Sequence, residues 1–290
     1  MKTKIMGIIT VVLALGTGRV AKAGNWTTLD APGGYLTSAR GIDGSNIVGY
    51  YYDASGHSHG FFYDGSTWTT LDMPRATKTE AFGIDGSNIV GYYYDVSGHS
   101  HGFLYDGSTW TTLDMPGAAG TQAFGIDGSN IVGKYGDASG YHGFLYNMTS
   151  LTWTTLDAPG ATITQAFGID GSNIVGRYNA HGFLYDGSIW TTFDMPGPYG
   201  TMAMGIDGSN SVGWYTDAIM DHYGFLYDGS TWTTLNALDG PPGTRYTEAF
   251  GIDGSNIVGG YNGHGFIYTI PEPTTLLLLG MGALILRKKN

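Results

Sequence analysis

Six copies of one segment fill most of this sequence and constrain its fold more than any other feature. The hexapeptide Gly-Ile-Asp-Gly-Ser-Asn begins at Gly41, Gly83, Gly125, Gly168, Gly205 and Gly251. A Trp recurs in step with it, at Trp26, Trp68, Trp110, Trp153, Trp190 and Trp232. The triplet His-Gly-Phe begins at His59, His101, His142, His181 and His264, with Tyr223 in place of His in the fifth copy. Such a period indicates a repeat architecture, and the copies occupy residues 24–270 as one domain.

Each copy contains four short strand candidates. In the second copy these are residues 80–85, 88–94, 101–106 and 109–114. Asp85-Gly86-Ser87 joins the first two, and Asp106-Gly107-Ser108 joins the last two. Asp-Gly between apolar runs is a strong hairpin signal, because Gly adopts a positive φ at little cost. The pattern predicts a four-stranded antiparallel meander in every copy.

The second strand of the meander shows how the sheets pack. Residues 89–94 are apolar, aromatic or Gly at odd and even positions alike. Successive side chains of a strand point to opposite faces, so both faces of this sheet need cover. A propeller blade stacked between two neighbours provides that cover. The sequence predicts an all-β fold, a six-bladed β-propeller; a β-solenoid and two stacked sheets are the alternatives.

The phase of the copies favours a closed ring. The strand that contains Trp26 is a fourth strand with no three strands before it, whereas the copy that starts at Gly251 lacks its fourth strand. Pairing the two would satisfy two exposed sheet edges at once. We therefore expect the N-terminal strand to complete the last blade.

The repeat unit resembles a known family of bacterial extracellular repeats. The segments Gly-Ile-Asp-Gly-Ser-Asn-Ile-Val-Gly, His-Gly-Phe-Leu-Tyr-Asp-Gly and Thr-Trp-Thr-Thr-Leu-Asp are similar to the HAF repeats. The usual HAF pattern has a Gly-Ile-Asn-like turn and His-Ala-Phe, where this chain has Gly-Ile-Asp and His-Gly-Phe. The resemblance implies a secreted repeat protein, and it brings no catalytic residues.

The first 23 residues have the pattern of a signal peptide. Lys2 and Lys4 precede an apolar run over residues 5–15, and Ala21 and Ala23 form an A-x-A cleavage signal. The apolar run is too short to span a bilayer as a helix. We expect export and a mature chain that begins near Gly24; a retained signal anchor is the alternative.

Residues 271–290 have three parts in a fixed order. Pro271, Glu272 and Pro273 precede an uncharged run over residues 274–286, and a basic cluster over 287–289 follows. This tail resembles the PEP-CTERM sorting signal, with a short transmembrane segment. The resemblance implies a Gram-negative source, transient inner-membrane anchoring, cleavage by an exosortase, and delivery to the cell surface or exopolysaccharide matrix. A permanent C-terminal membrane anchor is the alternative.

Charge excludes one class of partner. Residues 24–270 contain 6 basic and 23 acidic side chains, a net charge of −17. Sequence-independent nucleic-acid binding needs a basic surface, so a nucleic-acid partner is not expected. The chain has no Cys, which excludes disulfides and thiolate chemistry.

The repeated His and Asp residues are of types that bind metals or act in catalysis, but their pattern favours structural roles. Copies of His in adjacent blades would lie too far apart to share a metal; weak binding by pairs such as His57 with His59 or His99 with His101 is the alternative. The Asp of each Gly-Ile-Asp is expected to accept hydrogen bonds from the backbone N–H groups that follow it. We expect no metal and no cofactor, with Ca²⁺ in the loops as the alternative.

The connections between strands indicate where a ligand would bind. The turns after the first and third strands are nearly constant, whereas the connections after the second and fourth strands vary and emerge on the opposite face. Near the longest of these lie the candidate binding residues Trp214, Tyr215, Tyr223 and Tyr246. Aromatic rings suit sugar faces, and the negative charge favours a neutral glycan.

Three function classes follow. A non-catalytic protein that binds extracellular polysaccharide or a surface protein is favoured over an enzyme and over a purely structural coat. A polysaccharide-acting enzyme should show a carboxylate cluster that breaks the repeat. The candidates for such a cluster are Asp217, Asp221, His222 and Asp239, which are few and scattered in the sequence.

Overall fold

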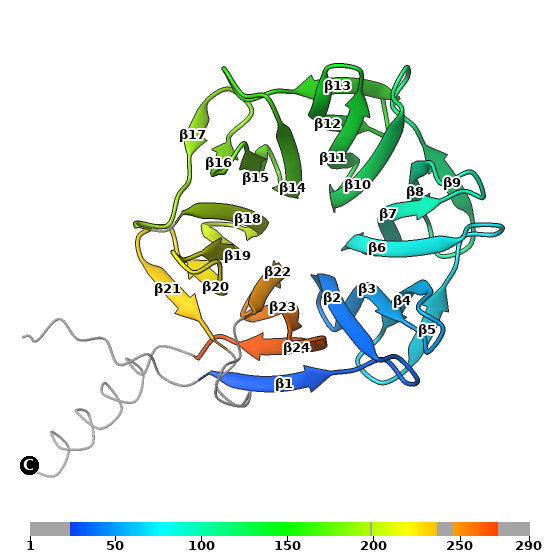
Figure 1. Ribbon diagram of the computed structural model, residues 1–290, viewed down its shortest axis with the longest axis horizontal. Coiled ribbons are helices and arrows are strands. Elements are labelled where there is room, and N and C mark those ends of the chain that lie inside the picture. Colours follow the sequence, from blue (N-terminus) through cyan, green and yellow to red (C-terminus); the bar gives the residue numbers. More distant parts are fainter. Residues whose placement is uncertain (1–23, 198, 237–245, 272–290) are drawn as a thin grey trace, which may run out of the picture.

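The computed structural model describes residues 24–197, 199–236 and 246–271, and these form a ring of six β-sheets around a central axis (Figure 1). Each sheet is a four-stranded antiparallel meander, and no helix occurs in the described ranges. The strands β2, β6, β10, β14, β18 and β22 lie nearest the axis (Figure 1). The structure confirms a six-bladed β-propeller and contradicts the solenoid and stacked-sheet alternatives.

The strands are given blade by blade, from the axis outward. Blade 1 holds β2 (Leu36–Asp43), β3 (Asn46–Tyr52), β4 (Ser58–Tyr63) and β5 (Trp68–Leu71). Blade 2 holds β6 (Lys78–Asp85), β7 (Asn88–Tyr94), β8 (Ser100–Tyr105) and β9 (Trp110–Leu113). Blade 3 holds β10 (Gly120–Asp127), β11 (Asn130–Asp137), β12 (Gly140–Asn147) and β13 (Thr152–Leu156). Blade 4 holds β14 (Thr164–Asp170), β15 (Asn173–Tyr178), β16 (His181–Tyr185) and β17 (Trp190–Thr192). Blade 5 holds β18 (Gly200–Asp207), β19 (Asn210–Thr216), β20 (His222–Tyr227) and β21 (Trp232–Leu235). Blade 6 holds β22 (Thr247–Asp253), β23 (Asn256–Tyr261), β24 (His264–Thr269) and β1 (Asn25–Leu29).

The N-terminal strand closes the ring. β1 pairs antiparallel with β24, from Asn25 opposite Thr269 to Leu29 opposite Gly265. Trp26 packs against Phe266 and Tyr268, with 4.8 Å between ring centroids in both contacts. The expected closure is therefore confirmed.

Both faces of each sheet are buried against a neighbouring blade. Ile89 on β7 packs in the cluster between blades 1 and 2, and the adjacent Val90 packs in the cluster between blades 2 and 3. The Phe of each His-Gly triplet is almost completely buried, as Phe103 is on β8. Trp110 on β9 packs edge-on against that ring at 4.9 Å. The repeated aromatic residues thus form the core between blades.

Glycine is required at two positions of the unit. Gly86 has a φ of 58° in the turn between β6 and β7, as a tight hairpin demands. A Cβ on Gly91 would lie 2.1 Å from the carbonyl oxygen of Glu80, so no larger residue fits on β7 there. These two constraints account for part of the high Gly content.

The two faces of the disc differ as the sequence predicts. We call the face that carries the turns between first and second and between third and fourth strands the constant face. The opposite face, with the connections after second and fourth strands, is the variable face. On the constant face, Asp85 pairs with Asn88 across the turn between β6 and β7.

Candidate functional site

Three of the variable positions inside the strands lie close to the axis. Two are cross-strand partners on the first and second strands, namely Ser38 with Tyr50, Glu80 with Tyr92, Gln122 with Lys134, Gln165 with Arg177, Met202 with Trp214, and Glu248 with Gly260. The third position is the bulged residue of the first strand, namely Arg40, Phe82, Phe124, Phe167, Met204 and Phe250. We call the variable-face mouth of the central channel, which these residues line, the vestibule.

The bulge directs one side chain per blade into the channel. Register shifts occur between Ala81 and Gly83 in blade 2 and at the same place in every other blade. Bulges of this kind redirect a side chain out of the regular alternation. The bulged residues line a narrow channel of about 80 Å³ together with the Gly and Ile that follow them. Five of the six are apolar, and Arg40 is the exception.

Arg40 is a largely buried cation in an aromatic ring. Its guanidinium carbon lies 3.7 Å from the Phe250 ring centroid, and Nη2 donates a hydrogen bond of 2.7 Å to the Tyr50 hydroxyl. Its Nε is buried and has no hydrogen-bond partner. Burial opposes the charge, but Tyr50, Glu248 and Glu80 outweigh it and raise the pKa of Arg40 above its ordinary value. Arg40 therefore stays charged.

The cross-strand pairs of blades 2 and 4 satisfy each other. The Tyr92 hydroxyl donates to the Glu80 carboxylate, which also accepts a hydrogen bond from Ser58. Burial and the Glu80 charge raise the pKa of Tyr92, so this phenol stays neutral. In blade 4, Nε of Arg177 donates to the side chain of Gln165 at 2.9 Å. The Glu80 and Tyr92 side chains are therefore already paired with each other, and Gln165 is paired with Arg177.

Blade 6 leaves a hollow where the other blades have a large side chain. Gly260 stands in place of Tyr50, Tyr92, Lys134, Arg177 or Trp214. A pocket of about 310 Å³ opens there on the variable face. Besides Gly260 and Phe250, its lining includes Ser38, Arg40, Tyr50, His222, Tyr246 and Glu248. We call it the Gly260 pocket.

An aromatic stack forms the side of this pocket. His222 and Tyr246 join blades 5 and 6 through an isolated backbone bridge, and their rings meet edge-on at 5.1 Å. The Trp214 ring stacks on His222 with 4.3 Å between centroids and 15° between planes. Nδ1 of His222 lies 2.6 Å from Oε1 of Glu248. Trp214 thus supports the pocket wall through His222, while half-exposed Tyr246 borders the pocket itself.

The other two candidate binding residues lie apart from this pocket. Tyr215 follows Trp214 on β19 and so points to the opposite face of the sheet. Its ring stacks on Tyr223 at 5.4 Å, and its hydroxyl is bonded to Thr234. Burial and a hydrogen bond to Asp217 raise the pKa of Tyr223. The structure therefore divides the four predicted aromatic residues into two pairs.

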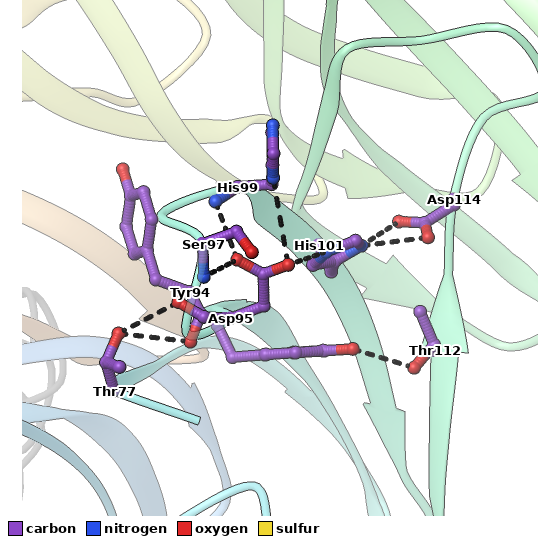
Figure 2. Close-up of polar contacts among 9 residues, drawn as sticks. Thr77, Tyr94, Asp95, Ser97, His99, His101, Thr112 and Asp114 are labelled. Carbon is purple, nitrogen blue, oxygen red and sulfur yellow. Dashed lines mark hydrogen bonds and ion pairs between the residues drawn. The ribbon is translucent and has the colours of Figure 1, made fainter. Parts of the chain in front are cut away.

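The repeated His residues form a structural network in the blades. Figure 2 shows the unit in blade 2, where Nδ1 of His101 lies 2.9 Å from Asp114 and Nε2 lies 3.6 Å from Asp95. Asp95 accepts backbone hydrogen bonds from Ser97 and His99, so it also shapes the connection. Among the described residues, no group of three His, Cys, Asp or Glu could hold a metal ion.

The network changes as a unit in blade 5. Tyr223 replaces the His, and Asn236 stands where the other copies have the Asp that pairs with that His.

The Asp partners shift the pKa of two of the His residues. In blade 1, burial lowers the pKa of His59, but Asp72 and Asp53 outweigh this effect and raise the pKa above its ordinary value. The same balance raises the pKa of His142, through Asp157 and Asp137.

One expectation for the Asp of each Gly-Ile-Asp is wrong. These carboxylates do not bond to the turn that follows them in the chain. Oδ2 of Asp43 accepts a hydrogen bond of 2.7 Å from the N–H of Gly86, in the corresponding turn of the next blade. The same bond occurs from Asp85, Asp127, Asp170, Asp207 and Asp253. The stacking of blades brings each carboxylate closer to its neighbour's turn than to its own.

A second hollow lies on the variable face between blades 2 and 3. It measures about 500 Å³, and Lys134, Tyr141, Tyr94 and Gln122 are among its lining residues. Gly136 stands there in place of Tyr52 or Tyr94. Burial and the nearby Arg177 charge lower the pKa of Lys134. Its ammonium lies 5.0 Å from the Tyr141 ring centroid.

Sequence reasoning missed the residues that define the Gly260 pocket. Arg40, Ser38 and Gly260 belong to no motif. When the six copies are aligned, Arg40 replaces the Phe that four other copies carry, and Ser38 and Gly260 are the smallest residues in two columns that vary among the copies. Of the enzyme candidates, Asp217 accepts backbone hydrogen bonds from Ile219 and Asp221, and Asp221 is buried. Only His222 lines the pocket, and Asp239 lies outside the described residues.

A comparison with protein families identifies the tail. Residues 269–289 match the PEP-CTERM protein-sorting motif, which confirms the expected sorting signal and indicates an exported surface protein with a C-terminal membrane-anchoring region. Of its core, Pro271 is described, whereas Glu272 and Pro273 lie outside the described residues, as do the signal-peptide residues Ala21 and Ala23. Within residues 24–197, 199–236 and 246–271, no helix is long and apolar enough to cross a membrane.

Solved structures share the fold at low sequence identity, and no curated protein matches the chain. TolB from Acinetobacter baumannii aligns with a TM-score of 0.54 and 12% identity, over 80% of this chain and 65% of that one. The SapL1 lectin in complex with alpha methyl fucoside aligns at 0.50 and 15%, over 82% and 97%. An acylaminoacyl peptidase from Pyrococcus horikoshii aligns at 0.50 and 11%, over 84% and 46%. These similarities establish the fold alone.

Proposed function

We propose that this exported protein is a non-catalytic binding protein of the cell surface or exopolysaccharide matrix, and that it holds a neutral glycan in the Gly260 pocket. One observation carries the proposal. Ser38 and Gly260 are the smallest residues in two variable columns, Arg40 is the one charged residue in its column, and together these three residues line one pocket on the variable face. Changes that served only packing would not be expected to open a pocket beside a charged, partly unpaired side chain.

The lining of the pocket suits a sugar. Tyr246 and Tyr50 offer aromatic surface, which packs against the apolar face of a pyranose ring. Arg40 offers N–H donors beyond the one given to Tyr50, and the Glu248 carboxylate offers acceptors beside its bond to His222. The cationic donor Arg40 and the anionic acceptor Glu248 can therefore bind neighbouring hydroxyl groups of one sugar. The net charge of −17 over residues 24–270 makes a neutral glycan the better ligand than an anionic one.

The chemistry of the pocket favours binding over hydrolysis. Most glycoside hydrolases use two carboxyl groups on either side of the scissile bond. Among the described residues that line the pocket, Glu248 is the one carboxylate, and it is held by His222. We therefore favour a binding role over the polysaccharide-acting enzyme. The resemblance to HAF repeats agrees with a secreted protein. The proposed glycan binding does not require Ca²⁺.

The ends of the chain define the route to the surface. We propose that the signal peptide is removed after Ala21-Lys22-Ala23, and that an exosortase cleaves near Pro271–Pro273 in a Gram-negative host. Before that cleavage the tail anchors the protein in the inner membrane. Intact-mass measurement of protein recovered from the cell surface tests this route. A mass that retains residues 274–290 would contradict tail cleavage.

The binding proposal is tested with matched variants. A glycan array probed with the purified protein identifies an oligosaccharide, which is then titrated while Trp fluorescence is followed. Tyr246→Ala removes an aromatic ring beside the pocket, and Gly260→Tyr fills the pocket as Tyr50 fills the corresponding place in blade 1. The Cβ of a residue at 260 meets nothing closer than 3.6 Å, so the substitution starts without a backbone clash. Both variants should lose binding at least about tenfold, the effect of one buried contact of ~1.4 kcal/mol.

The control is Tyr141→Ala, in the second hollow. Tyr141 and Tyr246 are both 50% exposed, so the two substitutions remove equal aromatic area from the same face. Binding should survive Tyr141→Ala. Loss of binding in Tyr141→Ala but not in Tyr246→Ala would place the binding site in the second hollow, between blades 2 and 3, and would overturn the assignment to the Gly260 pocket. An array with no binding to any glycan would overturn the function itself.

A further inference from the structure

Both ends of the propeller emerge on the constant face. In blades 1 to 5 a hairpin on that face joins the third strand to the fourth; in blade 6 the chain is open at this place, because β24 and β1 come from opposite ends of the sequence. Thr269 at the end of β24 pairs with Asn25 at the start of β1. The N–H of Ile270 donates a hydrogen bond of 2.8 Å to the carbonyl of Ser255, in the constant-face turn of blade 6. The exit point is thus held by the fold.

The tether between this exit and the membrane segment is short. Three residues, 271–273, separate Ile270 from the uncharged run that starts at Thr274. Even a fully extended chain spans at most ~3.5 Å per residue, so the Cα atoms of Ile270 and Thr274 are at most about 14 Å apart. A strand of six residues, such as β24, is about 20 Å long. The tether is therefore shorter than the thickness of the disc.

The constant face is also strongly acidic. Its turns contain ten carboxylates and neither Lys nor Arg, namely Asp43, Asp64, Asp85, Asp106, Asp127, Asp170, Asp186, Asp207, Asp228 and Asp253. Backbone and Ser hydrogen bonds lower the pKa of Asp64, Asp106 and Asp186, so these groups stay ionised. A face of this sign is repelled by anionic lipid over about a Debye length, ~10 Å at 0.1 M salt.

We propose that in the membrane-anchored form the constant face is turned toward the bilayer and the variable face, with its vestibule, points away from it. The short tether holds the constant face near the lipid headgroups, and its carboxylates keep it from lying flat on them. The sorting motif then lies between this face and the membrane, where a membrane-bound processing enzyme would meet it. This inference does not depend on what the vestibule binds.

The absence of Cys from the chain makes a direct test possible. Single Cys residues are introduced at exposed positions on both faces of two opposite blades. Ser45→Cys and Ser172→Cys place a label in the constant-face turns of blades 1 and 4. Ser55→Cys and Ala180→Cys place it in the variable-face connections of the same blades. The full chain is produced without an exosortase and reconstituted into phosphatidylcholine–phosphatidylglycerol nanodiscs that carry a headgroup nitroxide quencher.

Quenching should distinguish the faces. Labels at Ser45 and Ser172 should lose at least about twice as much fluorescence as those at Ser55 and Ala180, because the faces lie about 20 Å apart. Raising the salt concentration should increase quenching on the constant face, since screening weakens its repulsion from anionic lipid. Equal quenching of both faces would show a freely turning domain, and stronger quenching of the variable face would show the opposite orientation; either result overturns the proposal.

Discussion

Oδ2 of Asp253 accepts a hydrogen bond of 2.7 Å from the backbone N–H of Gly44, which joins the last inner strand of the propeller to the first. Five equivalent bonds join the other neighbouring blades, so a ring of carboxylates runs around the constant face. The propeller is therefore closed twice: by β1 at the outer edge of blade 6, and by Asp253 near the axis. The closure by β1 follows from the phase of the repeat in the sequence. The closure by Asp253 depends on the distance between neighbouring blades.

The inner closure can be measured by removing it. Asp253→Ala deletes the bond to Gly44 and should lower the free energy of unfolding by about 1 kcal/mol, the usual net contribution of one hydrogen bond. Asp127→Ala deletes the same bond, to Gly171, between blades 3 and 4. Urea unfolding followed by Trp fluorescence should give equal losses for both variants. In a ring open between blades 6 and 1, only Asp127→Ala would be destabilising.

The outer closure should be more important for stability. Deleting residues 24–32 removes β1, including buried Leu29 and the Trp26 ring that packs on Phe266. Loss of these apolar contacts and exposure of the β24 edge should cost several kcal/mol, about 2 or more for each large side chain. Thermal unfolding should show a markedly lower midpoint. A synthetic peptide of residues 24–32 should restore it, whereas an unchanged midpoint in the truncated protein would contradict closure.

The fold was predictable because its rules are local and repeated. The Asp85-Gly86-Ser87 turn specifies a hairpin through the positive φ of Gly86, and apolar residues on both faces of residues 89–94 specify cover on both sides. Predicted strand limits in blade 2 lie within two residues of those observed for β6 to β9. Six copies of one unit repeat these constraints, which leaves few alternatives.

The site was less predictable because it rests on departures from those rules. Gly260 opens the pocket because it has no side chain, and no sequence motif marks a missing side chain. Arg40 points into the channel because it occupies a bulge, and a bulge is not evident from residue type alone. Trp214 and Tyr246 are predictable from the sequence because they are unusual aromatic residues near long connections. Their separation from Tyr215 and Tyr223 follows from strand alternation, because Trp214 and Tyr215 are consecutive on β19 and point to opposite faces of the sheet.

Stability should fall slightly as the pH rises from about 6 to about 8. His59 and His142 have pKa values raised above the unfolded value of ~6.5, so the folded state binds these protons more tightly. Their stabilising contribution is complete below the unfolded pKa and is lost as the pH rises through the folded pKa. Each group should contribute under about 1 kcal/mol, because both are partly solvated. Urea midpoints measured across this pH range test the slope.

The natural variation of blade 5 supplies the control for that slope. The double substitution of His142→Tyr with Asp157→Asn gives blade 3 the pair that blade 5 carries as Tyr223 and Asn236. This variant should fold and show a smaller decrease in stability between the two pH values. A slope equal to that of the wild type would mean that His142 does not contribute to it.

Arg40→Phe should separate the stability of the protein from its binding. Burial and the partnerless Nε oppose the Arg40 charge, but Tyr50, Glu248 and Glu80 outweigh the cost of burial. Because the substitution restores the residue found at this position in four other blades but takes the cation away from those carboxylates, the free energy of unfolding should stay within about 2 kcal/mol of the wild type. It loses the contact over Phe250 at 3.7 Å but regains an aromatic contact there. The same substitution removes the Arg40 N–H donors from the Gly260 pocket and should abolish glycan binding.

Arg75→Gly is the control for Arg40→Phe, because it removes a cation from the variable face and restores the Gly that four other copies carry. Urea unfolding and the fluorescence titration, run on all three proteins, separate the two effects. A destabilised Arg40→Phe protein with intact binding would make Arg40 a structural residue and not a binding one.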